Sequence, residues 1–348
     1  MAYSTITKPS LYFNTKLYTG NGSDNHAITG VGFQPDWLWI KKRNGSTNHN
    51  LFDVVRGNSK GIQSNSNGAE YTSTETQKTF DSDGFTLGVN GQVNGNSDTF
   101  VGWNWKANGQ GSSNTDGSIN TTYTSVNTTA GFSIVSFTGT GSNATVGHGL
   151  GVAPKVIITK SRANNENWGF YHESTGNEKQ LVLNNDGSLT GASSAYYNNT
   201  SPTSTVFSVG TADSTNDAAN MVAYCFAEKK GYSKFGTYKG NGNTEGSFIY
   251  TGFKPAFILL KDSTSVVSWT IYDDQRSSSG NNPTDKIFHP NNSNAENTAD
   301  NIDIVSNGFK CRTSVAGTNK NNATFIYMAF AAEPLVANVG QSIPATAR

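Results

Sequence analysis

The 348 residues are enough for two or three domains of ordinary size, which excludes one small domain. The 25 Lys and Arg residues equal the 25 Asp and Glu residues, so the charge gives no reason to expect nucleic acid or an anionic membrane as a partner. Only 14% of residues are charged although the mean hydropathy is −0.50, so the polarity comes from Asn, Ser, Thr and Gly. The 37 Gly, the many Asn, Ser and Thr, and the 11% aromatic residues favour an all-β fold of short strands and tight turns.

The N-terminal segment MAYSTITKPS has no basic stretch followed by an apolar one, so no Sec-type signal is expected. No apolar run approaches the about 20 residues that a membrane-spanning helix needs. We therefore expect a soluble protein with no membrane partner.

Three stretches of the chain repeat one pattern of strands and turns. They begin with YFNTKLYTGNGS at Tyr12, FSIVSFTGTGS at Phe132 and YSKFGTYKGNGN at Tyr232. Three sets of landmark residues keep the same separations of 119 and then 101 residues: Gly20, Gly139 and Gly240; Pro35, Pro154 and Pro255; Lys41, Lys160 and Lys261. Because independent landmarks stay in step, the chain is predicted to form three tandem modules at residues 1–115, 116–229 and 230–348, the last with a C-terminal arm.

Each module is predicted to begin with a strand that leads into a Gly-rich turn. In the first and third modules this turn contains Asn-Gly, a dipeptide that favours tight turns between strands. The strand after the landmark proline follows, and in the first module Trp37 and Trp39 fall on one face while Leu38 falls on the other. Since both faces are apolar, we expect a strand that is covered on both sides.

Turn signals recur about every 8–12 residues, and no stretch shows sustained helical amphipathicity. Helix is therefore expected to be minor. The pattern favours three tandem β-sandwich modules of the jelly-roll or concanavalin-like kind over a βαβ sheet. Between the first two modules, the segment from Ala107 to Asn127 is rich in Gly, Ser, Asn and Thr, and we expect a flexible connection or surface loop there.

The sequence was searched for residues that could support catalysis or bind metal. The histidines are His26, His49, His148, His172 and His289, and no two have the spacing of metal ligands. His26 and His148 precede the proline-led strand, where solvent-exposed loop side chains are expected. Asp81 and Asp83 in DSDG indicate a turn, and Cys225 and Cys311 are expected to be buried free thiols. No enzyme activity, metal or cofactor is predicted.

Four tryptophans stand in alternating pairs, Trp37 with Trp39 and Trp103 with Trp105. Flat aromatic rings could stack on sugar rings, but the matching positions of the last strands hold other large apolar residues: Tyr224, Phe226, Met328 and Phe330. Positions that keep size and apolarity are typical of a core, so we expect the tryptophans to be buried.

The segments GFQPDWLWIKKR, FDSDGFTLG and FVGWNWKANG, with the tail AAEPLVANVGQSIPATAR, resemble a β-rich domain that recurs in structural proteins of marine tailed bacteriophages, in products called tail fibre or virion proteins. The resemblance covers essentially the whole chain in three copies. It implies a virion component with a concanavalin-like or related sandwich, and it supplies no catalytic residues. The second copy departs from it, because Gly-Val-Ala-Pro from Gly151 to Pro154 replaces Gly-Phe-x-Pro, which puts a shared ligand for all three copies in doubt.

From this we expect a virion surface protein, tail-fibre-like or binding a receptor or glycan through polar loop tips. The alternative is a capsid decoration protein or tail adaptor with a purely structural role; a polysaccharide-degrading enzyme is the least favoured hypothesis. Candidate loop-tip contacts are Asn21, His26, Asn241 and Asn243, and a candidate docking arm contains Pro334, Leu335, Ile343 and Pro344. The expected partners are other virion proteins, a host-cell glycan, and further copies of the chain in a homo-oligomer on the particle.

Overall fold

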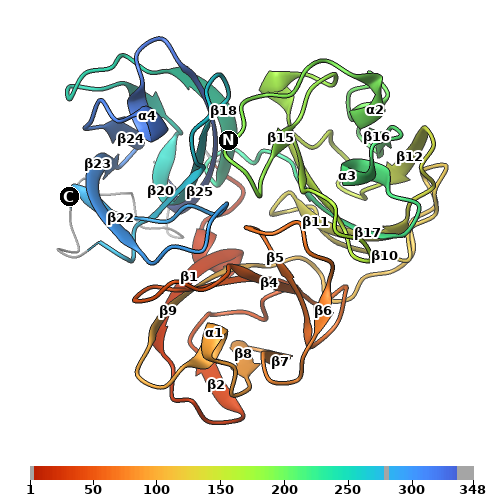
Figure 1. Ribbon diagram of the computed structural model, residues 1–348, viewed down its shortest axis with the longest axis horizontal. Helices are drawn as coiled ribbons and strands as arrows, with labels where there is room; N and C mark the ends of the chain where they lie inside the picture. Colours follow the sequence, from red (N-terminus) through yellow and green to blue (C-terminus); the bar gives the residue numbers. More distant parts are fainter. Residues whose placement is uncertain (1–3, 278–281, 335–348) are drawn as a thin grey trace.

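The computed structural model describes residues 4–277 and 282–334. Their strands pair antiparallel, and each of the four α-helices has only four residues, so the predicted all-β class with minor helix is confirmed. None of the sheets closes into a barrel. The three repeats, called copies 1 to 3 below, form three lobes around a common centre (Figure 1).

Copy 1 contributes two sheets. The larger one has the order β1 (Phe13–Thr19), β9 (Thr99–Trp105), β3 (Trp37–Lys42), β4 (Asn50–Asp53), β5 (Lys60–Gln63) and β6 (Tyr71–Thr72). The smaller one has the order β2 (His26–Thr29), β8 (Gly84–Leu87) and β7 (Gln77–Asp81). The short helices are η1 (Pro9–Leu11) before β1 and α1 (Gly91–Asn94) before β9.

Copy 2 also has a larger and a smaller sheet. Its larger sheet has the order β10 (Tyr123–Asn127), β11 (Phe132–Thr138), β17 (Asn220–Phe226), β13 (Val156–Ser161), β14 (Gly169–His172) and β15 (Leu181–Val182). Its smaller sheet pairs β12 (Ala144–Gly147) with β16 (Val206–Val209). The helices are η2 (Glu173–Thr175), α2 (Ser194–Tyr197) and α3 (Asp213–Asn216).

Copy 3 again has two sheets. One has the order β18 (Ser233–Lys239), β25 (Thr324–Pro334), β20 (Phe253–Asp262) and β21 (Thr270–Asp273). The other has the order β19 (Phe248–Tyr250), β24 (Gly308–Cys311), β23 (Asn297–Val305) and β22 (Thr284–Ile287). Helix α4 (Ala316–Asn319) stands before β25, where α1 and α3 stand in the other copies.

The proline-led strand of each copy is apolar on both faces because each face packs into a different core. In copy 1, Trp37 and Trp39 lie in the largest hydrophobic cluster, while Leu38 lies in a second cluster formed by copy 1 alone. The alternation repeats in β13 and β20, where Ile158 and Leu259 face the large cluster. Since successive strand residues point to opposite faces, one strand serves both cores.

The largest cluster is shared by all three copies and occupies the centre of the molecule. Aromatic rings join each pair of copies there. The ring centroids are 4.5 Å apart for Trp37 and Tyr224, 5.4 Å for Trp105 and Phe257, and 5.8 Å for Phe226 and Phe330. Ile6 also lies in this cluster, so the N-terminal segment packs into the core. The copies are therefore joined by their cores and not only by their connecting segments.

The four paired tryptophans are buried, as predicted for a core, and so are Trp168 and Trp269; both cysteines are buried free thiols, as expected. DSDG forms the turn between β7 and β8. The expectation of a flexible connection was wrong for part of residues 107–127, because Tyr123–Asn127 form β10 and Ile119 packs into the core of copy 2. His148 is buried, not solvent-exposed, because the Thr203 segment packs beside it, and its Nε2 lies 3.1 Å from the Thr203 carbonyl oxygen.

Candidate functional site

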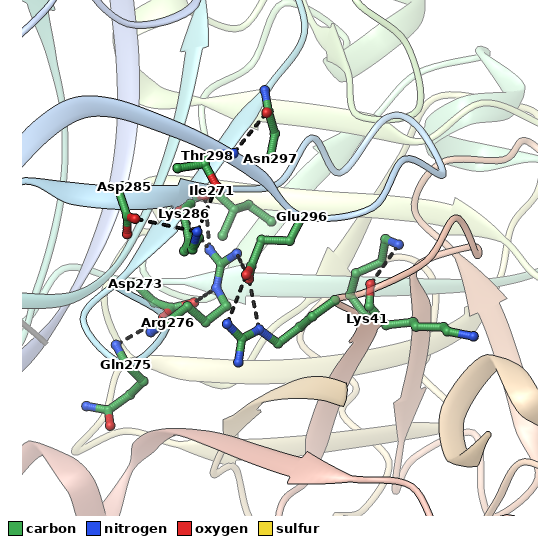
Figure 2. Close-up of polar contacts among 12 residues, drawn as sticks. Lys41, Ile271, Asp273, Gln275, Arg276, Asp285, Lys286, Glu296, Asn297 and Thr298 are labelled. Atoms are coloured by element: carbon green, nitrogen blue, oxygen red, sulfur yellow. Dashed lines mark hydrogen bonds and ion pairs between the residues drawn. The ribbon is translucent and has the colours of Figure 1, made fainter. Parts of the chain in front are cut away.

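Charged side chains form a buried cluster where copy 3 meets copy 1 (Figure 2). Asp273 ends β21, and Arg276 lies three residues later in the turn that follows. The Nε of Arg276 donates to Asp273 Oδ2 at 2.5 Å. Both side chains are fully buried. Arg276 Nη1 also lies 3.1 Å from Oε2 of Glu296, which stands just before β23. The pair is thus extended into a chain of alternating charges.

Copy 1 completes this cluster from the other side of the interface. Arg43, the residue after β3, donates from Nε and Nη2 to the two carboxylate oxygens of Glu296, both at 2.9 Å. Trp103 of copy 1 donates its indole N–H to Asp273 Oδ2 at 2.9 Å. Two-point Arg–carboxylate contacts fix orientation as well as distance. The cluster therefore holds copies 1 and 3 in one register.

The same cluster recurs where copy 1 meets copy 2. Asp53 Oδ2 accepts from Arg56 Nε at 2.5 Å, and Arg56 Nη1 lies 3.2 Å from Glu70 Oε2. Arg162 of copy 2 donates to both oxygens of Glu70, at 2.9 and 3.0 Å. Tyr224 of copy 2 donates to Asp53 Oδ2 at 2.7 Å. Each position corresponds to one in the first cluster, in the order Asp, Arg, Glu, Arg and aromatic donor.

These contacts set the charge states. Burial alone would raise the pKa of Glu70, but the hydrogen bonds from Arg162 and the charge of Arg56 outweigh it and hold that pKa below its ordinary value. Burial also disfavours the charged form of Arg56, yet Asp53 and its other neighbours raise the pKa above the usual value. Both shifts favour the ionised forms of Glu70 and Arg56, which pair with each other.

Among the residues that the structure describes, the interface between copies 2 and 3 lacks this cluster. The equivalent position is identified by a main-chain hydrogen bond that all three interfaces share: Glu70 N to Arg162 O at 2.9 Å, Glu296 N to Arg43 O at 2.9 Å, and Leu189 N to Ser263 O at 3.0 Å. Leu189 and Ser263 thus replace the Glu and the second Arg. His172, at the end of β14, and Thr175 replace the Asp and the first Arg. The four charged positions are exchanged together, so none of these four positions keeps a charge.

His172 is buried at this third interface. Burial lowers its pKa from the ordinary value of 6.5 to about 4, so the ring is neutral at neutral pH. Its Nδ1 accepts from Ser174 N at 3.2 Å, and Nε2 lies 3.4 Å from the carbonyl oxygen of Tyr327 in copy 3. A neutral ring with one acceptor and one donor fits these contacts.

The landmark lysines are buried and bind main-chain carbonyls. Lys41 Nζ donates to Lys42 O at 3.0 Å, Lys160 Nζ to Ser161 O at 2.7 Å, and Lys261 Nζ to Asp262 O at 2.7 Å. Burial lowers the pKa of each lysine to about 8. Each lysine also donates from Nζ to the carbonyl oxygen of the residue four positions further along, so it closes the loop after its strand. Their repetition is explained by this structural role.

The Gly-rich turns are anchored by a buried Asn in each copy. In copy 1, Asn94 Oδ1 accepts from Asn21 N at 3.0 Å, and Asn94 Nδ2 donates to Ser23 O at 2.9 Å. Asn216 and Asn319 make the same contacts in copies 2 and 3. A Cβ at Gly20 would lie 2.3 Å from the Gly95 carbonyl oxygen, which explains the landmark glycine.

The predicted loop-tip contacts lie on these turns. Asn21, Asn241 and Asn243 are exposed and His26 is half-buried. His26 Nδ1 lies 2.7 Å from the Oδ1 of the anchoring Asn94, and Asn241 Oδ1 accepts from Asn243 N at 3.0 Å. The structure brings Asn21 and His26 together in copy 1 and Asn241 and Asn243 together in copy 3, on separate lobes. Part of their hydrogen-bonding capacity is used within the turns.

The predicted docking arm begins differently from the expectation. Pro334 is buried as the last residue of β25, where its register partner is Phe253, so it belongs to the sheet and not to an arm. Leu335, Ile343 and Pro344 lie outside the described residues.

The charged clusters were missed at the sequence level although one signal was available. Asp53-x-x-Arg56 and Asp273-x-x-Arg276 have the same separation from their landmark lysines. Spacing within one copy does not reveal their partners. Arg162 comes from another copy than Arg56, and Glu296 follows Arg276 after a loop whose length differs from that between Arg56 and Glu70. Within residues 4–277 and 282–334, no group of three or more His, Cys, Asp or Glu is placed to hold a metal ion.

The model of a family described as "Domain of unknown function (DUF7483)" matches residues 8–334. No curated protein and no solved structure matches the chain. Across the part of the chain that the structure describes, no helix combines the length and the apolar character required to cross a membrane.

Proposed function

The chain belongs to the family described as Domain of unknown function (DUF7483), and we propose that it is a non-enzymatic virion surface protein that attaches to a receptor or glycan. The observation that carries this proposal is the closure of three copies around one shared core, with an equivalent turn presented by each lobe. Loops held on a rigid scaffold are common places for recognition. The resemblance of the repeats to phage structural proteins supports the virion location.

The buried ionisable groups support a structural role over a catalytic one. The carboxylates of Asp53 and Asp273 are each fully buried against an Arg and an aromatic donor. The landmark lysines donate to main-chain carbonyls that close loops. The buried carboxylates contact partners across the interfaces and the lysines close loops, so each group already has partners from the chain itself.

We also propose that each copy is a β-sandwich module. The strands β3, β13 and β20 place alternate residues in the shared core and in a core of their own copy, as the inner sheet of a sandwich does. The smaller sheets supply the other side of the local cores, for example through Phe85, Phe207 and Phe309.

The second candidate function is a capsid decoration protein or tail adaptor. The compact three-lobed shape favours it, because the lobes meet at one centre and form no elongated shaft in the described residues (Figure 1). In this role the outer surfaces would contact other virion proteins, and further copies of the chain would complete a homo-oligomer on the particle.

Cryo-electron microscopy of purified particles tests these proposals. Three-lobed density at the tail tip would support receptor attachment, whereas density on the capsid would support decoration. Antibody detection of the chain in the same particles provides an independent measure. Its absence from purified particles would refute both virion roles.

A further inference from the structure

One position just before the second strand of each large sheet contacts the neighbouring copy. The register of this strand against the proline-led strand aligns His49, Trp168 and Trp269. Trp168 Nε1 donates to Gln63 O of copy 1 at 3.0 Å, and Trp269 Nε1 donates to Val182 O of copy 2 at 3.0 Å. Consecutive copies are thus joined by an indole N–H. Copies 3 and 1 are not consecutive in the chain, and their interface has a histidine at this position instead.

His49 is fully buried and contacts both of these copies. Its Nδ1 accepts a hydrogen bond from the indole N–H of Trp39 in copy 1 at 2.9 Å. Because an indole N–H can only donate, Nδ1 is unprotonated and the neutral imidazole carries its proton on Nε2. The main chain of His289 in copy 3 interacts with this imidazole. His289 holds the register position of Gln63 and Val182, so His49 takes the place of the indole at the third interface.

Two cations lie around the same aromatic ring of copy 3 as His49. The centroids of the His49 and Phe288 rings are 5.7 Å apart. Lys41 Nζ lies 5.2 Å from the Phe288 centroid, and the guanidinium carbon of Arg276 lies 4.6 Å from it. His289 follows Phe288 in the chain and is a further titratable side chain whose charge opposes protonation of His49. A protonated His49 would therefore be an additional positive charge in a site that already holds two.

The carboxylates of this interface are engaged by the two arginines of the charged cluster. Asp273 and Glu296 both contact Arg276, and Glu296 also contacts Arg43. A proton on His49 would not gain either carboxylate as a new partner without breaking one of these ion pairs.

These surroundings favour the neutral form of His49 while the interface is closed. Burial and the charges of Lys41 and Arg276 hold the pKa of His49 well below its ordinary value. The second proton would also have to enter at Nδ1, where it would displace the hydrogen bond from Trp39. In an open interface the imidazole is in water and regains an ordinary pKa of about 6.5. The open form therefore binds one more proton than the closed form, and acid favours opening.

We propose that His49 is an acid-sensitive latch, and that its protonation opens the interface between copies 3 and 1 while the interface between copies 1 and 2 stays closed. The copy 1–2 interface contains an equivalent cluster of carboxylates and arginines, but it has Trp168 at the latch position and so lacks the titrating group. The open population should rise about tenfold for each pH unit below 6.5. This inference goes beyond the proposed attachment function and does not depend on it.

The test is amide hydrogen exchange of the full-length protein between pH 6.5 and 4.5, corrected for the intrinsic exchange rate at each pH. Two equivalent main-chain hydrogen bonds report the two interfaces: Glu296 N to Arg43 O for copies 3 and 1, and Glu70 N to Arg162 O for copies 1 and 2. We expect the opening constant at Glu296 to rise about tenfold per pH unit relative to that at Glu70. Protonation of the glutamates themselves acts on both reporters and so cancels in this ratio.

The variant His49→Gln removes the titrating group and keeps an oxygen that can accept from Trp39. In this variant the Glu296 and Glu70 amides should respond alike to acid. His49→Trp is the second variant, because it carries the residue of copies 2 and 3, and it should have the same effect. The matched control is His172→Gln, which removes a buried histidine of the copy 2–3 interface and should keep the acid response at Glu296.

Two results would overturn the inference. One is an equal response of the Glu296 and Glu70 amides to acid in the native protein. The other is a selective response at Glu296 that persists in a His49 variant whose circular dichroism shows the native fold.

Discussion

Replacing Arg56 with methionine leaves the Asp53 carboxylate buried without its cation. The guanidinium contacts Asp53 at 2.5 Å and Glu70 at 3.2 Å, and it donates to the carbonyl oxygens of Lys60 and Leu51, both at 3.0 Å. Removing one partner of a buried ion pair costs about 3–5 kcal/mol. We therefore expect Arg56→Met to reduce the free energy of unfolding by that amount, measured by urea denaturation.

The matched control is Arg312→Met, whose side chain is 46% exposed and whose ion pair is long. Such a surface pair contributes about 0–1 kcal/mol. A loss for Arg56→Met no larger than that of the control would refute the argument that the buried cluster depends on complete pairing.

The interface between copies 2 and 3 supplies a second comparison. There the whole cluster is replaced by His172, Thr175, Leu189, Ser263 and, at the aromatic donor position, Met328. The combined variant Asp53→His/Arg56→Thr/Glu70→Leu/Arg162→Ser/Tyr224→Met removes every charge of the copy 1–2 cluster together. Because no charge is left unpaired, we expect it to lose less stability than Arg56→Met alone. A larger loss would show that the ion pairs themselves stabilise the interface.

Three further predictions follow from the same contacts. The free energy of unfolding should fall by up to about 3 kcal/mol as the pH is lowered from 6.5 towards 4. In this range His172 takes up a proton in the unfolded chain, whereas its pKa of about 4 keeps the ring neutral in the folded chain. The variant His172→Gln should not show this part of the pH dependence when its denaturation is measured. Asn94→Ala should cost about 1–3 kcal/mol and speed hydrogen exchange at Asn21, while the Asn319-anchored turn of copy 3 stays protected as an internal control. Because the copies share a core, calorimetry should show one unfolding transition, and three separate transitions would contradict the shared core.

Local pattern was enough to predict the strands and the buried aromatic residues. Period-two alternation around Trp37 and Trp39 indicated a strand covered on both sides, because neighbouring residues on a strand must point to opposite faces. Repeated Asn-Gly turns and landmark glycines located the tips of the three copies. These features depend on residues close together in the chain, so sequence spacing was sufficient to find them.

What covers the tryptophan face was decided only by the tertiary structure. Trp37 stacks on Tyr224, which lies in another copy, and Arg43 reaches Glu296 across most of the chain. Such contacts depend on how the copies close around their centre, and spacing within one copy carries no information about that closure. The same reason explains why His148 was expected in solvent: its burial comes from the Thr203 segment, which local sequence could not place beside it.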